Sequence, residues 1–125
     1  MAANGAGNRS DLEEARMNFS DLKLSMTPIP LWCEREDTSR STYERLVKER
    51  LLTPPLNFGR RKVRPDLEDS IVKEAWTRGC GKPEIQALVA CLEELRPEPD
   101  GEVVLERARA FVGELLRRRD TTKAA

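Results

Sequence analysis

The densest group of chemically active side chains in the sequence is basic. Four cations lie within five positions, at Arg60, Arg61, Lys62 and Arg64, and the only nearby aromatic residue is Phe58. Guanidinium and ammonium groups bind phosphate and carboxylate oxygens, so this cluster predicts recognition of an anion. Three interpretations remain open: a nuclear import address, a contact with a protein, or a contact with nucleic acid. The single aromatic favours the first two, because binding of single-stranded nucleic acid uses several stacking rings.

A second basic cluster consists of Arg117, Arg118 and Arg119, at the end of the last predicted helix. Cations in a final helical turn interact favourably with the helix dipole, so the fold itself explains them. No helix terminus requires the cluster at 60–64, which favours a role outside the fold. If the two clusters lay on one face, RNA binding would become the preferred interpretation.

The composition argues against catalysis and against a dedicated nucleic-acid binder. The chain has 125 residues and no histidine, which removes the commonest general base and the commonest zinc ligand. Lys+Arg and Asp+Glu both number 22, so no net basic field exists to drive phosphate binding. No phosphate-binding loop motif is present, and we expect neither an enzyme nor a cofactor.

The three cysteines, Cys33, Cys80 and Cys91, are widely spaced and form no CxxC motif. This pattern is typical neither of a zinc site nor of a disulfide framework, and it predicts reduced thiols. The N-terminus has no apolar signal region, and no run of about 18 apolar residues could cross a membrane. We therefore expect a protein of the nucleus, the cytoplasm or both, with no membrane partner and no small-molecule substrate.

Prolines, glycines and apolar spacing predict an all-α fold. Residues 66–119 carry three apolar stripes at helical spacing, with breaks at Gly79 and Pro97, and indicate an antiparallel three-helix module. A helix at 42–52 is the nearest candidate for a fourth member. The remaining regions are expected to be a disordered or extended arm at 1–41 with a short helix at 11–18, a proline-bracketed connector at 53–65, and a disordered tail at 120–125.

Several apolar residues are candidates for contacts with a partner. Ile29, Leu31 and Trp32 lie beside Pro28 and Pro30, where they form either part of the core or a short linear docking motif. The apolar band of the last helix is wider than a bundle needs, which predicts partly exposed side chains. The full set of expected partner contacts is Ile29, Leu31, Trp32, Phe58, Phe111 and Leu115.

The remaining tryptophan and two threonines also have predicted roles. Trp76 is expected in the core of the module, and Thr27 and Thr53 precede prolines, as proline-directed kinases require. Together the patterns predict a non-catalytic adaptor or regulatory protein that binds another protein, or a second copy of itself, through its helical module and proline-rich arm. The alternative is an RNA-binding regulator, for example a viral accessory protein, whose two arginine clusters form one phosphate-binding face.

Overall fold

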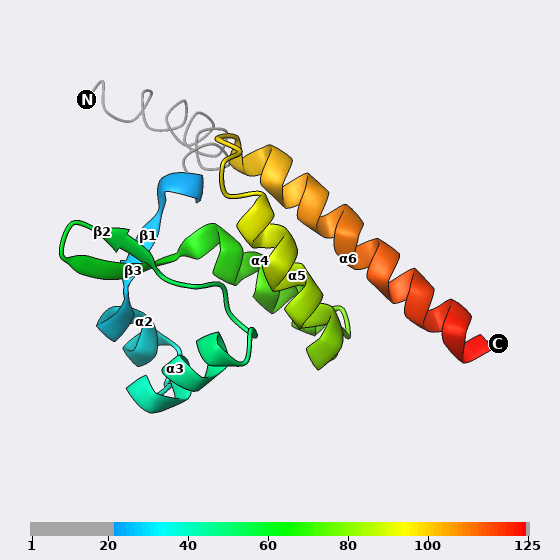
Figure 1. Cartoon of the computed structure of the whole chain (residues 1–125), viewed down its shortest axis with the longest axis horizontal. Helices are drawn as coiled ribbons and strands as arrows, with labels where there is room; N and C mark the ends of the chain where they lie inside the picture. The colour runs from blue at the N-terminus through cyan, green and yellow to red at the C-terminus, as the bar shows by residue number, and fades with distance from the viewer. Residues whose placement is uncertain (1–21, 125) are drawn as a thin grey trace, which may run out of the picture.

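The computed structural model of the protein describes residues 22–124, which form five α-helices and a small antiparallel sheet (Figure 1). The helix expected at 11–18 lies outside the described residues. The elements in chain order are the 3₁₀-helix η1 (Leu22–Leu24), β1 (Met26–Pro28), α2 (Ile29–Arg35), α3 (Arg40–Lys48), β2 (Leu56–Phe58), β3 (Arg61–Pro65), α4 (Asp66–Thr77), α5 (Lys82–Glu94) and α6 (Gly101–Ala124).

The sheet shows that the all-α prediction is wrong. Its strand order is β1-β3-β2, and Val63 at the centre of β3 lies opposite Pro28 on one side and Leu56 on the other. The expected connector at 53–65 is therefore mostly a β-hairpin. Gly59 has φ +65° and is the first residue of a two-residue turn, which matches the type II′ geometry favoured in hairpins.

The arm expected to be disordered is ordered in its described part. Residues 22–41 contain η1, β1, α2 and the start of α3. Ile29 and Trp32 are buried, and they form a small hydrophobic core with Tyr43 and Leu52. The rings of Trp32 and Tyr43 pack with centroids 5.2 Å apart and a tilt of 60°. Burial of two aromatic side chains repays the ordering of this short segment.

The helix expected at 42–52 begins earlier and ends earlier, as α3. The Ser39 hydroxyl caps it by accepting a hydrogen bond from the Thr42 N–H at 3.1 Å. Arg50 then adopts φ +64°, and the Leu51 N–H donates to the Leu46 carbonyl at 2.9 Å. This left-handed residue ends the helix by a Schellman-type contact, well before the prolines at which the sequence pattern placed the end.

The three-helix module is present as α4, α5 and α6, close to the predicted bounds. Gly79 ends α4 with φ +97°, as its position in the sequence predicts. The side chains of the module core are almost fully buried; they are Leu51, Leu67, Ile71, Val72, Ala75, Cys80, Ile85, Leu88, Val89, Leu92, Val104, Ala108 and Val112. The expected disordered tail is helical, since α6 continues to Ala124.

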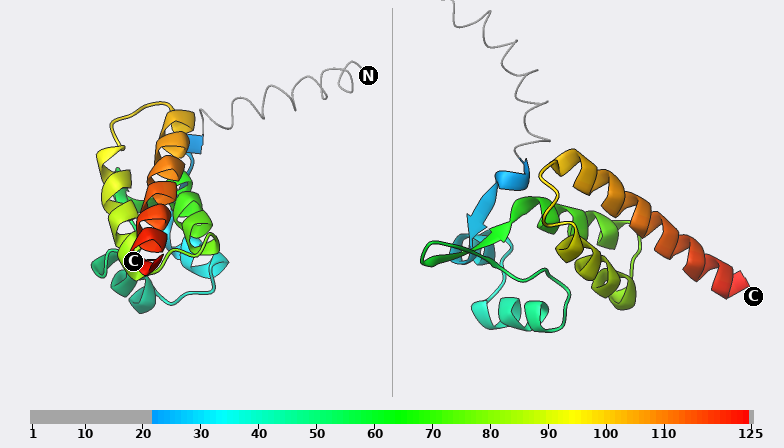
Figure 2. Two further views of the ribbon diagram at one scale, coloured as in Figure 1. Left: turned by 90° about the vertical axis from the view of Figure 1, so that its right-hand side faces the viewer. Right: turned by 45° about the horizontal axis from the view of Figure 1, so that its top comes forward.

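The α2–α3 pair and α6 lie on opposite sides of α4 and α5 (Figures 1 and 2). At 24 residues α6 is about 36 Å long, roughly twice the length of either partner helix, and its C-terminal end projects beyond them. The structure thus has two small hydrophobic cores, and Leu46 packs against both. Within the described residues the surface is hollowed at the seam between these cores and at the tip of the β-hairpin.

Candidate functional site

The tip of the β-hairpin and the start of α2 enclose a hollow of about 530 Å³, here called the basic hollow. Its lining residues are Pro28, Ile29, Pro30, Arg40, Arg60, Arg61 and Lys62. No carboxylate is among these described lining residues. Three of the four cations that the sequence singled out are therefore together, and a fourth cation from another element, Arg40, joins them.

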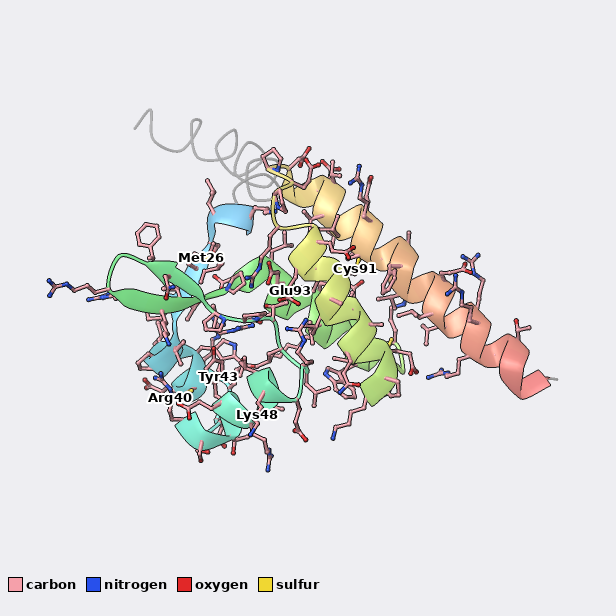
Figure 3. The ribbon with its side chains drawn as sticks, viewed as in Figure 1. Met26, Arg40, Tyr43, Lys48, Cys91 and Glu93 are labelled. Atoms are coloured by element: carbon pink, nitrogen blue, oxygen red, sulfur yellow. The ribbon has the colours of Figure 1, made fainter. Side chains whose placement is uncertain are left out.

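Local backbone geometry places these cations. The turn at Gly59 and Arg60 brings Arg61 opposite Phe58 and Lys62 opposite Asn57, so the basic run occupies the exposed end of the hairpin. Arg40 is the first residue of α3, and Figure 3 shows it beside α2, on the side of the molecule that carries the hairpin. Arg40 could not be found from sequence, because twenty residues separate it from the cluster and only the folded chain brings them together.

The cations of the hairpin tip have no ion-pair partner among the described side chains. Within residues 23–121, whose side chains the structure describes, no hydrogen bond or ion pair joins Arg60, Arg61 or Lys62 to another side chain. Arg40 pairs only with the exposed Glu44, at 3.3 Å on its own helix, and lies 6.0 Å from the centre of the Tyr43 ring. The basic hollow therefore has several donors available for an external anion.

Arg64 does not belong to this surface, which corrects the sequence assignment. Its side chain is fully buried and forms an ion pair with Asp69 of α4. Its guanidinium also donates to the carbonyl of Thr53 and, at 3.2 Å, to the Thr53 hydroxyl. Burial in β3 changes along the strand: Arg61 and Lys62, next to the turn, are exposed, whereas Arg64 lies at the base of the strand, where it is covered. The buried arginine anchors the strand, and the exposed ones remain available for binding.

The Arg64–Asp69 pair shows opposing effects on pKa. Burial raises the pKa of the Asp69 carboxyl above its usual value, and the hydrogen bond and charge of Arg64 oppose that rise. Burial lowers the pKa of Arg64, but the contacts with Asp69 more than offset it, so the pKa of Arg64 is raised. The guanidinium is therefore charged at all ordinary pH values, and it supplies the counter-charge that the buried carboxylate needs.

The second basic cluster lies at the far end of the molecule. The hairpin and the C-terminal end of α6 occupy opposite ends in Figures 1 and 2. Arg117 and Arg118 pair with Glu114 on their own helix, at 2.7 and 3.3 Å. Arg119 donates to Glu84 at 3.1 Å and to the Gly79 carbonyl at 2.7 Å, so it fastens α6 to the α4–α5 turn. The two clusters do not form one face.

The second hollowed region is an amphipathic groove of about 700 Å³ between α4 and the α2–α3 pair. The groove follows the seam between the two hydrophobic cores. Its lining residues are Ser25, Trp32, Arg35, Glu36, Thr38, Leu46, Leu51, Leu52, Asp66, Asp69, Ser70, Val72, Lys73 and Trp76. A junction of two packed units is a preferred place for binding sites in proteins.

Trp76 is the apolar side chain most open to solvent in this groove. It is 44% exposed, so its assignment to the core is wrong. The sequence pattern placed the neighbours Ala75 and Trp76 together on the apolar face of the helix. Only Ala75 is buried, at 1% exposure. Across the groove Lys73 pairs with Glu36 at 2.7 Å, and Arg35 lies 3.9 Å from Asp66. The charged rim is balanced, and its middle is apolar.

The structure divides the predicted partner contacts into three groups by burial. Ile29 and Trp32 are at most 5% exposed and belong to the N-terminal core, so the proline-rich segment is not a free linear motif. Leu31 and Phe58 are exposed, at 54% and 76%. Phe111 packs partly against the module core and Leu115 is half-buried; neither faces one of the two hollows.

Neither predicted kinase site presents its hydroxyl to solvent. Thr53 has no exposed surface, and its hydroxyl accepts a hydrogen bond from Arg64. Thr27 is 5% exposed and donates to the Asp66 carboxylate at 2.6 Å. A kinase would have to open the structure locally to reach either residue, at β1 for Thr27 and at the contact with Arg64 for Thr53, which argues against phosphorylation of the folded protein.

Burial raises the pKa of the thiols of Cys80 and Cys91 above the ordinary cysteine value. A thiol with a raised pKa is a weak nucleophile at neutral pH, and neither lines a hollow. Residues 22–124 contain no group of three His, Cys, Asp or Glu side chains that could hold a metal ion. Within the same residues no helix is long and apolar enough to span a membrane.

Comparison of the chain with protein-family models, with curated proteins and with solved structures finds no match. The function therefore has to be inferred from the chemistry of the basic hollow and the amphipathic groove.

Proposed function

We propose that the protein is a non-catalytic adaptor and that the amphipathic groove binds the apolar face of a helix from a partner protein. The observation that carries this proposal is the half-exposed indole of Trp76 on the wall of a groove of about 700 Å³. Half-exposed tryptophans in apolar grooves are typical hot spots of protein interfaces, because one side chain removes a large apolar area from water on binding.

The length of the α4 wall supports a helical ligand. One wall is the face of α4 from Asp66 to Trp76, a length of about 15 Å at the rise of an α-helix. The floor is formed by leucines at the end of α3 and just after it, Leu46, Leu51 and Leu52. Anchors at helical spacing on a partner could fill this length, which is the usual mode of helix-in-groove recognition.

The charges of the rim indicate how such binding would respond to salt. Lys73 with Glu36 and Arg35 with Asp66 place equal numbers of positive and negative charges around the apolar middle. A balanced rim provides orientation and little long-range attraction. Affinity at the groove would therefore come from apolar burial and would change little with ionic strength.

Photo-crosslinking in cells tests the groove. A benzoyl-phenylalanine at Ser70, which is exposed and lines the groove, should capture a specific protein. The same group at Ala90, which is exposed on α5 away from the groove, is the matched control. The captured protein is then titrated against the wild type and Trp76→Ala, where a loss of about 2 kcal/mol, roughly thirtyfold in Kd, is expected.

Two results would contradict the proposal. One is equal crosslinking at Ser70 and Ala90, because the groove would then show no preference for a partner. The other is an affinity of the captured protein that does not change in Trp76→Ala, because the contact would then lie elsewhere.

A further inference from the structure

We propose that the basic hollow recognises a phosphorylated side chain of a partner protein. This site shares no lining residue with the amphipathic groove, so the inference does not rest on the groove. It assigns the cations at 60–62 and Arg40 to one anion-binding function.

The number and kind of donors suit a phosphate monoester. A phosphoserine or phosphothreonine carries about −1.5 to −2 charges at neutral pH and three strong acceptor oxygens. The hollow offers three guanidinium groups and one ammonium group, and no carboxylate lines it. Of these four donors Arg40 alone has a described carboxylate partner, the exposed Glu44 on its own helix. Clusters of arginines can donate hydrogen bonds to several oxygens of one phosphate group at once. A carboxylate has only two oxygens and one negative charge, so it would bind such a cluster less tightly.

The fold supplies a reason for the cations to remain close together without a ligand. Like charges at the tip of a short hairpin repel one another, so a flexible segment would spread them apart. Here the two-residue turn at Gly59 fixes the tip, and the buried pair of Arg64 with Asp69 fixes the base of β3. A backbone that is fixed before binding limits the loss of entropy when the anion arrives to the ordering of the exposed side chains.

The surroundings of the hollow favour a peptide over a nucleic acid. Pro28, Ile29 and Pro30 form an apolar part of its lining, and the exposed Phe58 lies opposite Arg61 on the hairpin. Apolar contacts of this kind suit the side chains that flank a phosphorylated residue. A nucleic acid needs a track of successive phosphate contacts, and the other arginine cluster lies at the opposite end of the molecule.

The test measures binding of defined probes by fluorescence anisotropy. One probe is a pool of short labelled peptides with a central phosphoserine or phosphothreonine between random positions, and the second is the same pool without phosphate. The third is a labelled single-stranded oligouridine RNA. We expect the phosphorylated pool to bind about tenfold or more tightly than the unphosphorylated pool, with an affinity that weakens as salt is raised.

Charge-neutral variants locate the site. The triple variant Arg60→Gln/Arg61→Gln/Lys62→Gln should lose binding of the phosphorylated pool. Arg40→Gln, which changes a different element, should weaken it several-fold. The control Arg117→Gln/Arg118→Gln removes exposed cations at the other end and should leave it unchanged. Trp76→Ala should also leave it unchanged, so failure here and failure of the groove are distinguishable. Circular dichroism checks that each variant is folded.

Four results would overturn the inference. The first is absence of binding of the phosphorylated pool at low salt. The second is equal binding of both peptide pools, which would make the hollow a general acidic contact. The third is binding of the RNA but not of the phosphorylated pool, which would make it a nucleic-acid site. The fourth is an equal loss in Arg117→Gln/Arg118→Gln, which would show a response to overall charge.

Discussion

Arg64 of β3 and Asp69 of α4 form an ion pair that is closed off from solvent. The arginine side chain has no exposed surface and the aspartate side chain is 12% exposed. The guanidinium also bonds to Thr53, and it lies 5.7 Å from the centre of the Tyr43 ring. One side chain thus connects the sheet, the segment after α3 and the helical module. The cation that looked like part of a binding surface is a structural anchor.

Removal of one partner of this pair should destabilise the protein strongly. Arg64→Leu leaves a buried carboxylate without its counter-charge, and we expect a loss of about 3–5 kcal/mol in the free energy of unfolding. Urea denaturation followed by circular dichroism measures it. Arg61→Leu, which removes an exposed cation from the same strand, should change stability by less than about 0.5 kcal/mol. Equal losses of unfolding free energy in the two variants would show that the buried contacts of Arg64 stabilise the protein no more than an exposed cation does.

Two glycines should respond in opposite directions to alanine. Gly59 has φ +65°, so Gly59→Ala forces a side chain into the left-handed region and should cost about 1–2 kcal/mol, although nothing lies within 4 Å of the added Cβ. Gly113 lies inside α6, and the nearest atom to its added Cβ is Arg78 Nη2 at 3.8 Å. Gly113→Ala should therefore stabilise by about 0.5–1 kcal/mol. Thermal melts of the two variants give the signs, and a neutral Gly59→Ala would rule out the turn geometry.

The helical module could be predicted from the sequence because its signals are local. Gly79 ends α4, Pro83 begins α5 near its first turn, and the apolar stripes repeat every three to four residues. Each of these signals acts within one or two turns of a helix, so no tertiary information is needed to interpret it. The basic run at 60–64 is also visible in the sequence, but only the structure separates its three exposed cations from the buried Arg64.

The sheet was missed because its information is mostly long-range. Strands β1 and β2 have three residues each, too short for alternation to be visible. The pairing of β1 with β3 joins residues more than thirty positions apart. One local signal existed: Gly59 followed by Arg60 between two short strands is typical of a type II′ turn. The prolines on both sides of this turn are also typical of an irregular connector, which is the interpretation that the sequence analysis gives.

The two tryptophans differ in burial, and their replacement should separate them. Trp32 is 5% exposed and packs on Tyr43, so Trp32→Ala should cost about 3–5 kcal/mol. Trp76 is 44% exposed, and Trp76→Ala should cost about 1 kcal/mol. Circular dichroism in urea is the suitable measurement, because it does not depend on the fluorescence of the residue removed. A larger loss in Trp76→Ala would contradict the burial of the two side chains.

Cys80 should make stability fall at alkaline pH. It is 4% exposed, and burial raises the pKa of its thiol, with a further rise from Glu84 that Arg119 and Arg78 oppose. The folded state therefore holds the thiol proton more tightly than the unfolded state does. The resulting contribution to the free energy of unfolding is fully present below the unfolded pKa of about 8.5. It is lost as pH rises toward the folded pKa, at no more than about 1.4 kcal/mol per pH unit for one thiol.

The measurement of the Cys80 contribution compares the wild type with Cys80→Ala in urea at a series of pH values, with a phosphine reductant present. All other titrating groups are common to both proteins, so their difference in unfolding free energy isolates this thiol. The advantage of the wild type over the variant should be constant near neutral pH and should shrink above about pH 8.5. A difference that stays constant through the alkaline range would mean that the Cys80 thiol titrates alike in the folded and unfolded states.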